Sequence, residues 1–278
     1  MQLKKWSIAT LSLLAMHGAI AGHAQETKLS ELPLLVIGAS YSEAKTPFNN
    51  GIAPQGGRAV NFGNYLSLGA ALTRDHQLPG YVINEAQAGA GTFTRFQCPP
   101  GAATCSAAVW DSFQVQLQRA LTRVALPPPA AAGTYNAKYV VITIANDCLH
   151  AGGMGVPQPT SVPCTLADMN ATADRLVALG NFALSKGLIP IFTSYPKYED
   201  LDFPLFKTSS NVAWVIDEQG YQTLRDLVES RLEAELPGAI LLDIWKEFTH
   251  IGDGLHPDPD STRKAAHEIA KHLRQLDH

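Results

Sequence analysis

The fold follows first from residues 34–40, which read LLVIGAS. The first four of these residues form a continuous apolar run that Pro33 precedes and Gly38 ends. Such a run, without polar alternation, is typical of a strand buried on both faces of a parallel sheet. The pattern therefore predicts a strand over Leu34–Ile37 and a turn over residues 38–40.

Further strands and helices alternate along the rest of the chain. Four more short apolar runs predict strands at Tyr81–Ile83, Tyr139–Ile144, Leu188–Phe192 and Ile240–Ile244. Apolar residues at helical spacing predict helices at Val60–Leu72, Val109–Val124, Leu166–Lys186, Tyr221–Leu236 and Thr262–Leu273. This alternation predicts an α/β protein with one parallel sheet that helices cover on both faces.

Three long linkers separate these elements, and each follows the C-terminal end of a predicted strand. They are Tyr41–Ala59, Ala90–Cys105 and Cys148–Pro163. Doubly wound sheets bind their ligands at that edge, so we expect the functional site there. No boundary for a second domain is visible.

Composition excludes several classes of protein. The chain has 278 residues, of which 46% are hydrophobic and 17% are charged, and its formal net charge is −4. A typical globular domain has about 25% charged residues. The fraction here is lower still, which excludes a disordered chain kept open by its charges. The acidic balance argues against a nucleic-acid partner, because phosphate binding needs a basic surface.

The N-terminal residues have the pattern of a secretory signal peptide. Met1–Lys5 carries two lysines, Trp6–Met16 is mostly apolar, and small residues follow up to Ala24. We expect cleavage after Ala24, with Ala21 as the other candidate, which leaves residues 25–278 as one domain. An apolar run of this length is short of the ~20 residues that span a bilayer. The expected location is secreted or periplasmic, without stable membrane insertion.

Export makes disulfides expected for the four cysteines, Cys98, Cys105, Cys148 and Cys164. Three pairings exist in principle. We favour the two local ones, Cys98–Cys105 and Cys148–Cys164, because each closes a loop that contains Gly or Pro. A zinc site with four cysteine ligands is the alternative, but no CxxC pair is present.

Three polar or glycine positions follow predicted strands. Ser40 ends the first turn, where a hydroxyl is exposed beside backbone N–H groups. Gly89 comes five residues after Asn84, and a glycine there lets a backbone N–H approach a reacting oxygen. Asn146 carries a neutral amide donor at the third strand end. Each residue type is also common in ordinary turns.

The segment GDGLHP at residues 252–257 follows the fifth predicted strand and carries a sharper signal. Asp253 lies three residues before His256 in a loop shaped by Gly and Pro. From that spacing the carboxylate reaches one ring nitrogen and sets the tautomer, so that the other nitrogen is available as a general base.

Together these segments resemble the SGNH subgroup of the GDSL esterase/lipase family, in the right order along nearly the whole chain. The resemblance implies a three-layer α/β/α sandwich with a five-stranded parallel sheet in flavodoxin-like order. It implies Ser40, Asp253 and His256 as the catalytic residues. It also implies an oxyanion hole made by the N–H groups of Ser40 and Gly89 and by the side chain of Asn146.

The activity implied by the resemblance is hydrolysis of carboxylic esters through an acyl-enzyme, by a serine hydrolase without a metal or organic cofactor. The expected partner is a small-molecule, lipid or glycan ester, and the oligomeric state stays open. Two positions depart from the family pattern. Ala39 replaces an aspartate beside the nucleophile, and Ile144 replaces the leading glycine of the third block.

Other interpretations compete with this one. A secreted binding module that keeps the fold without turnover would account for the two departures. An α/β-hydrolase elbow needs a glycine where Ser42 stands, and the Ser-x-x-Lys pattern that begins at Ser42 lacks its companion motifs. A metal site would draw on carboxylates and imidazoles of one loop and the helix start after it, namely His250, Asp253, His256, Asp258 and Asp260.

Overall fold

The core of the molecule is a parallel sheet with strand β1 (Leu34–Ile37) near its centre. All four residues of β1 are buried. The strand pairs in parallel with β4 (Val82–Asn84) on one side and with β7 (Tyr139–Ile142) on the other. Beyond β7 lie β8 (Ile189–Thr193) and then β9 (Ile240–Leu242), which gives the order β4-β1-β7-β8-β9. This is the predicted five-stranded parallel sheet in flavodoxin-like order, and the prediction is confirmed.

The computed structural model describes residues 31–43, 53–55, 58–60, 66–74, 78, 80–96, 107–143, 146–149, 163–210 and 214–276. The predicted signal peptide over residues 1–24 lies outside these ranges, as do Cys98, Cys105 and Ile144. Within the described ranges, no helix has both the length and the apolar character needed to cross a membrane.

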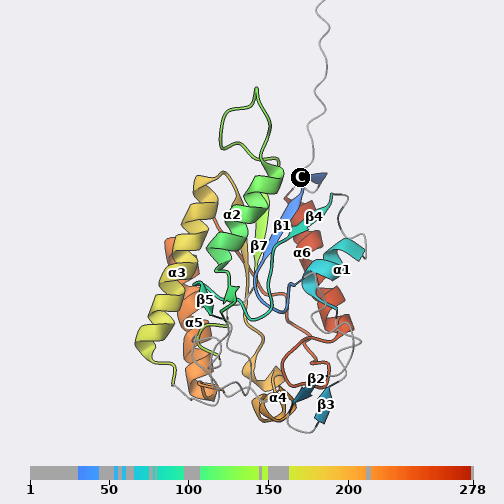
Figure 1. Ribbon diagram of the computed structural model, residues 1–278, viewed down its shortest axis with the longest axis vertical. Helices are drawn as coiled ribbons and strands as arrows, with labels where there is room; N and C mark the ends of the chain where they lie inside the picture. The colour runs from blue at the N-terminus through green and yellow to red at the C-terminus, as the bar shows by residue number, and fades with distance from the viewer. Residues whose placement is uncertain are drawn as a thin grey trace, which may run out of the picture.

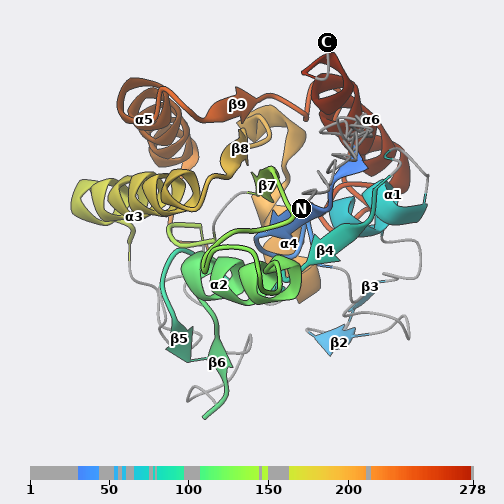
Figure 2. The same cartoon turned by 90° about the horizontal axis from the view of Figure 1, so that it is seen from above.

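Helices cover both faces of the sheet, which completes the three layers (Figure 2). One face carries α2 (Phe113–Val124), α3 (Leu166–Ser185) and α5 (Glu218–Glu235). The other face carries α1 (Leu68–Arg74) and α6 (Pro259–Gln275). Local capping explains where the longer helices begin: a side-chain oxygen accepts a first-turn backbone N–H at Ser112, Thr165, Asp217 and Asp258.

The strand register brings the carboxyl ends of the central strands to one level. Ile37 lies opposite Ile142, and Val36 lies opposite both Asn84 and Val141. The segments that leave β1, β4 and β7 therefore start side by side at the same edge of the sheet.

Small elements that the sequence did not predict gather at this edge (Figure 1). Two antiparallel ribbons pair β2 (Ala53–Gln55) with β3 (Arg58–Val60), and β5 (Arg95–Phe96) with β6 (Val109–Trp110). A 3₁₀ helix and a short α-helix complete the set, namely η3 (Tyr198–Asp200) and α4 (Phe203–Ser210).

Two predicted helix starts are wrong. The helix predicted from Val109 begins only at Phe113, because Ser112 caps it and residues 109–110 pair with β5 instead. The helix predicted from Val60 begins at Leu68, and Val60 itself ends strand β3. At Val109 the pairing is with the distant β5, and at Val60 it is with β2, only two residues away from β3; in both cases strand pairing overrides the helical spacing.

A disulfide joins Cys148 to Cys164, as the sequence predicted. Backbone hydrogen bonds run from Cys164 N to the oxygen of Val215 and from Val215 N to the oxygen of Leu149. Leu149 and Cys164, which belong to the chain between β7 and α3, are thus both bonded to Val215 in the chain after α4. The second predicted pair, Cys98–Cys105, falls outside the described residues.

Candidate active site

Ser40 lies in a buried turn directly after β1. The turn depends on Gly38, whose φ is 146° and whose absent Cβ would lie 1.9 Å from the Thr143 hydroxyl oxygen. A residue with a side chain would be strained there and would push the end of β1 away from the segment after β7. The turn closes with a hydrogen bond from Ser42 N to the oxygen of Ala39, at 3.1 Å.

His256 reaches this turn from a point 216 residues further along the chain. Its Nε2 lies 2.9 Å from Ser40 Oγ, and its Nδ1 lies 2.5 Å from Asp253 Oδ2. An ionised carboxylate only accepts hydrogen bonds, so Nδ1 carries the ring hydrogen. Nε2 is then left to accept the hydrogen of the Ser40 hydroxyl.

Asp253 is completely buried, and its two oxygens are satisfied separately. Oδ2 accepts from the His256 ring, while Oδ1 accepts the backbone N–H groups of Leu255 and His256, both at 2.9 Å. Burial by itself raises the pKa of Asp253. The charge and hydrogen bond of His256, with the two backbone N–H groups, outweigh burial and hold this pKa below its ordinary value.

The loop that carries Asp253 and His256 is closed on itself. His250 and Pro257 form an antiparallel bridge, and Ile251 N donates to the oxygen of His256 at 2.9 Å. Inside the loop, His250 Nδ1 accepts the backbone N–H groups of Gly252 and Gly254, at 3.0 and 3.3 Å. Both glycines have positive φ, which an L side chain rarely adopts.

The histidines and carboxylates of the metal-site alternative serve other partners. Besides the His250 and Asp253 contacts above, Asp258 Oδ1 caps α6 by accepting Ser261 N, and Asp260 pairs with Arg263. Among the residues that the structure describes, no group of three or more His, Cys, Asp or Glu side chains is arranged to hold a metal ion.

Aromatic rings border the His256 imidazole. The ring of Tyr41 lies 5.9 Å from it and that of Phe206 lies 6.0 Å from it, between centroids. The Tyr41 hydroxyl also donates to the oxygen of Leu255 at 2.5 Å. This contact ties the residue that follows Ser40 to the residue that precedes His256.

Gly89 lies in the segment after β4, which is bonded to the same turn. Gln87 N donates to the oxygen of Gly38 at 3.1 Å, and Ala90 N closes a turn onto the oxygen of Gln87. Gly89 has a φ of 82°, and a Cβ on it would lie 2.6 Å from the Trp110 ring. Only glycine fits this position without a shift of Trp110.

Asn146 is buried after β7 and contacts the Gly89 segment. Its Nδ2 donates to the oxygen of Ala90 at 3.1 Å. The structure therefore brings together all five residues of the site that the sequence predicts: Ser40, Asp253 and His256 by direct hydrogen bonds, and Gly89 and Asn146 through the segment bonded to the Ser40 turn.

Solved structures with a similar arrangement of strands and helices include two esterases and a lipase. A carbohydrate acetylesterase from Sinorhizobium meliloti matches with a TM-score of 0.53 and 13% identity, over 88% of this chain and 100% of that chain. An aryl esterase from M. smegmatis matches with 0.53 and 15%, over 88% and 99%. A GDSL-like lipase from Bacteroides thetaiotaomicron matches with 0.50 and 11%, over 88% and 89%.

The chain has the SGNH-hydrolase fold. At these identities the likeness is one of fold. No protein-family model matches the sequence, and no curated protein matches it either.

Sequence reasoning missed a buried arginine that the SGNH-hydrolase fold holds behind Gly89. Arg95 Nη2 donates to the oxygen of Gly89 at 2.5 Å, and its guanidinium lies 5.3 Å from the ring centroids of both Phe93 and Trp110. Burial lowers the pKa of Arg95 below its ordinary value, although Asp147 acts in the opposite direction. No local pattern identifies this residue, because its contacts come from folding of the β5–β6 ribbon.

Asp147, next to Asn146, was also missed. It is almost completely buried and accepts the backbone N–H and the hydroxyl of Thr92, at 2.9 and 2.6 Å. Arg175 on α3 donates to the same hydroxyl at 2.5 Å and approaches Asp147 at 3.5 Å. The sequence signal that could have identified Asp147 is its place beside Asn146, directly after a predicted buried strand. A carboxylate buried there needs several hydrogen-bond donors, which makes it part of a polar cluster.

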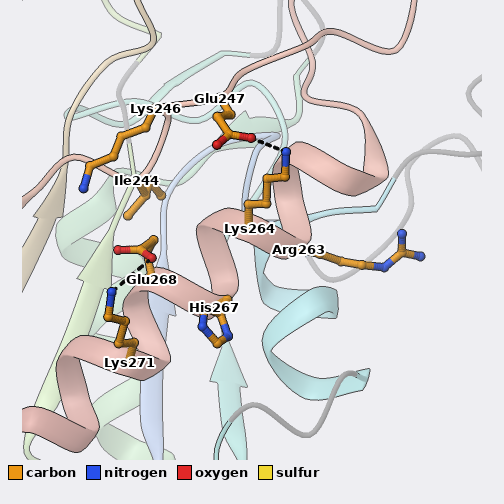
Figure 3. Close-up of a pocket in the computed structure, with 8 residues that line it drawn as sticks. All are labelled: Ile244, Lys246, Glu247, Arg263, Lys264, His267, Glu268 and Lys271. Carbon is orange, nitrogen blue, oxygen red and sulfur yellow. Dashed lines mark hydrogen bonds and ion pairs between the residues drawn. The ribbon is translucent and has the colours of Figure 1, made fainter.

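The pocket drawn in Figure 3 lies elsewhere on the SGNH-hydrolase fold, on α6 and the segment that follows β9. Its volume is about 570 Å³, and it shares no lining residue with the site around Ser40. Ion pairs of Lys264 with Glu247 and of Lys271 with Glu268 neutralise much of its charge. We assign the candidate active site from hydrogen-bond geometry, and this pocket has no part in it.

The lowered pKa of Asp253 predicts an acid-sensitive contribution to stability. Because the folded-state pKa is below the unfolded value of about 3.9, this contribution is fully present above that value and is lost as pH falls through the folded pKa. We expect wild type to have a larger free energy of unfolding than Asp253→Asn near neutral pH, and the difference to shrink below about pH 4. Urea titrations at a series of pH values measure it. A difference that grows toward acid pH would contradict the assignment.

Proposed function

We propose that this protein is a serine esterase that hydrolyses carboxylic esters by transferring the acyl group to Ser40 and then to water. The observation that carries the proposal is the hydrogen-bonded series from Ser40 Oγ through the His256 ring to Asp253, at 2.9 and 2.5 Å. The SGNH-hydrolase fold, shared with solved esterases and lipases, supports the same reaction class.

In the first half of the proposed reaction, Ser40 Oγ attacks the ester carbonyl carbon while His256 Nε2 takes the hydroxyl proton. Asp253 keeps the ring in the required tautomer and stabilises the imidazolium that forms. His256 then gives the proton to the departing alcohol, which leaves Ser40 acylated. In the second half, His256 takes a proton from water as the water oxygen attacks the acyl carbon. The bond between that carbon and Ser40 Oγ then breaks, His256 returns the proton to Ser40 Oγ, and the carboxylic acid leaves.

The negative oxygen of the tetrahedral intermediate needs donors that are already in place. We propose the N–H groups of Ser40 and Gly89 and the side chain of Asn146. Asn146 Nδ2 carries two hydrogens, and the bond to Ala90 uses one of them. The second is available to the oxyanion. The buried Arg95 guanidinium, bonded to the oxygen of Gly89, adds a positive charge behind this site.

The binding-module alternative has less support. Its sequence argument depends on Ala39 and Ile144, and Ile144 lies outside the described residues. Ala39 is buried and makes the turn apolar at that point without separating Ser40 from His256. A protein that only binds has no use for an imidazole held between a serine hydroxyl and a buried carboxylate.

Hydrolysis of p-nitrophenyl acetate and p-nitrophenyl octanoate by the purified protein tests the proposal. Ser40→Ala and His256→Ala are expected to abolish nearly all turnover, because the nucleophile and base act as a unit. Asn146→Ala is expected to lower kcat by about 10²–10³, the usual effect of losing one oxyanion donor. The ratio of the two rates reports the preferred acyl length.

Two matched controls accompany these variants. Ser185→Ala removes an exposed serine at the end of α3, and His272→Ala removes a histidine in the last turn of α6. Both are expected to retain wild-type rates. Wild-type activity in Ser40→Ala would exclude the proposed nucleophile.

We also propose that the protein is exported, to the periplasm or out of the cell. The pattern of residues 1–24 supports this, and so does the Cys148–Cys164 disulfide, because disulfides persist in oxidising compartments. N-terminal sequencing of the mature protein is expected to start at Gln25. Recovery only of a reduced protein that starts at Met1 would contradict export.

A further inference from the structure

The Gln116 side chain on α2 reaches the turn that carries Ser40. It is completely buried, and its Oε1 accepts the backbone N–H of Gly38 at 2.9 Å across 78 positions of sequence. The pairing of β1 with β7 ends at Ile37, and the oxygen of Gly38 accepts Gln87 N. The Gln116 side chain therefore accepts the Gly38 N–H, which is the first backbone donor after the end of β1 and lies two residues before Ser40.

The same end of α2 also holds the segment of Gly89. Phe113 N donates to the oxygen of Gly91 at 3.0 Å, and Asp111 N donates to Gln87 Oε1 at 3.0 Å. The Trp110 ring fills the space beside Gly89. Residues 110–116 thus contact the Ser40 turn through one side chain and the Gly89 segment through backbone and ring contacts.

Tyr41 and the backbone of Ser42 anchor the chain after Ser40, but the side chains of the two residues before it provide no hydrogen bond. Ala39 is buried and has no polar atom in its side chain. Gly38 has no side chain and a backbone conformation that is open to many alternatives in the absence of hydrogen bonds. The bond from Gly38 N to Gln116 Oε1 limits the rotation of the peptide between Ile37 and Gly38, the last peptide before the Ser40 turn.

We propose that Gln116 is a positioning residue for the esterase reaction, and this inference rests on the function proposed above. Its amide fixes the Gly38 peptide relative to the Gly89 segment. By doing so it sets the relative orientation of the Ser40 hydroxyl, the Ser40 N–H and the Gly89 N–H. These groups act together only on the transition state, so loss of Gln116 lowers kcat and leaves KM nearly unchanged.

The test uses Gln116→Met, which has similar length but no strong hydrogen-bond acceptor, with p-nitrophenyl acetate as substrate. Gln118→Met is the matched control, because it makes the same exchange at an exposed site on the same helix. Leu121→Ala controls for instability, because it removes a buried side chain of α2 far along the helix from Gly38. We expect kcat of Gln116→Met to fall about 10- to 100-fold, because a small misplacement of reacting groups lowers a rate by about that much. Gln118→Met keeps the wild-type kcat. Leu121→Ala lowers the melting temperature but lowers kcat much less than Gln116→Met does.

Gln116→Glu provides a second variant if the Met variant folds poorly. The protonated carboxyl keeps an acceptor for Gly38 N–H and a donor for the oxygen of Asp111, which Gln116 Nε2 approaches at 3.4 Å. Burial raises the pKa of such a carboxyl. As pH rises and it ionises, the donor is lost and a negative charge faces the oxygen of Asp111, so the side chain no longer holds the Gly38 peptide in place. We expect kcat to fall with rising pH in this variant but not in wild type.

The outcomes separate the two proposals. If the wild type is active and Gln116→Met has the same kcat, the role of Gln116 is overturned while the esterase function stands. The same holds if Gln116→Met and Leu121→Ala have equal melting temperatures and Gln116→Met loses no more kcat than Leu121→Ala does. A wild-type pH profile in Gln116→Glu overturns it as well. An inactive wild type contradicts the esterase function, and the positioning role with it.

Discussion

The site depends on the parallel pairing of β1 with strands on both of its sides. Because β4 and β7 run in the same direction and in level register, the segments that leave all three strands start at one edge. That edge receives Ser40 from β1, Gly89 from β4 and Asn146 from β7. A fully buried central strand must be apolar along its whole length, and this is why LLVI precedes the serine turn.

Two buried polar clusters follow from this arrangement, and each must satisfy its own charges. A buried carboxylate is costly unless donors surround it. Asp253 meets this need with two backbone N–H groups and the His256 ring. Asp147 meets it with Thr92, two residues after Ala90 in the Gly89 segment, and with Arg175. The first cluster supplies the proposed chemistry, and the second holds the segment that carries Gly89, the proposed oxyanion donor.

The sequence allowed prediction of what depends on local pattern. The bounds of β1 are those predicted, and the parallel direction of the five strands follows from the alternation of apolar runs with helical stretches. The order of the strands was implied by the resemblance to the SGNH subgroup. Ser40 and Asn146 lie at strand ends, where both residue types are also common in ordinary turns, and they were identified because all the motifs together resemble the SGNH subgroup in the right order. The Asp253-x-x-His256 spacing was informative because both residues lie in one short loop.

What escaped prediction depends on contacts between distant segments. The β5–β6 ribbon pairs residues on either side of a long linker, and its backbone bonds override the helical spacing that begins at Val109. Arg95 lies in a stretch that the sequence predicts as a linker, and Gln116 lies on an amphipathic helix; polar residues at such positions are ordinarily exposed. Only the fold turns Gln116 toward Gly38 and Arg95 toward the oxygen of Gly89. No spacing rule in the sequence contains that information.

The most direct measurement is the labelling of the purified protein with a p-nitrophenyl alkylphosphonate, followed by peptide mass spectrometry. This reagent forms a stable bond with a serine hydroxyl only when a base activates it and donors receive the phosphonyl oxygen. We expect release of about one p-nitrophenolate per chain, a label on the peptide that contains Ser40, and greatly slowed labelling in His256→Ala. An unlabelled protein, or a label on another residue that Ser40→Ala leaves unchanged, would contradict it.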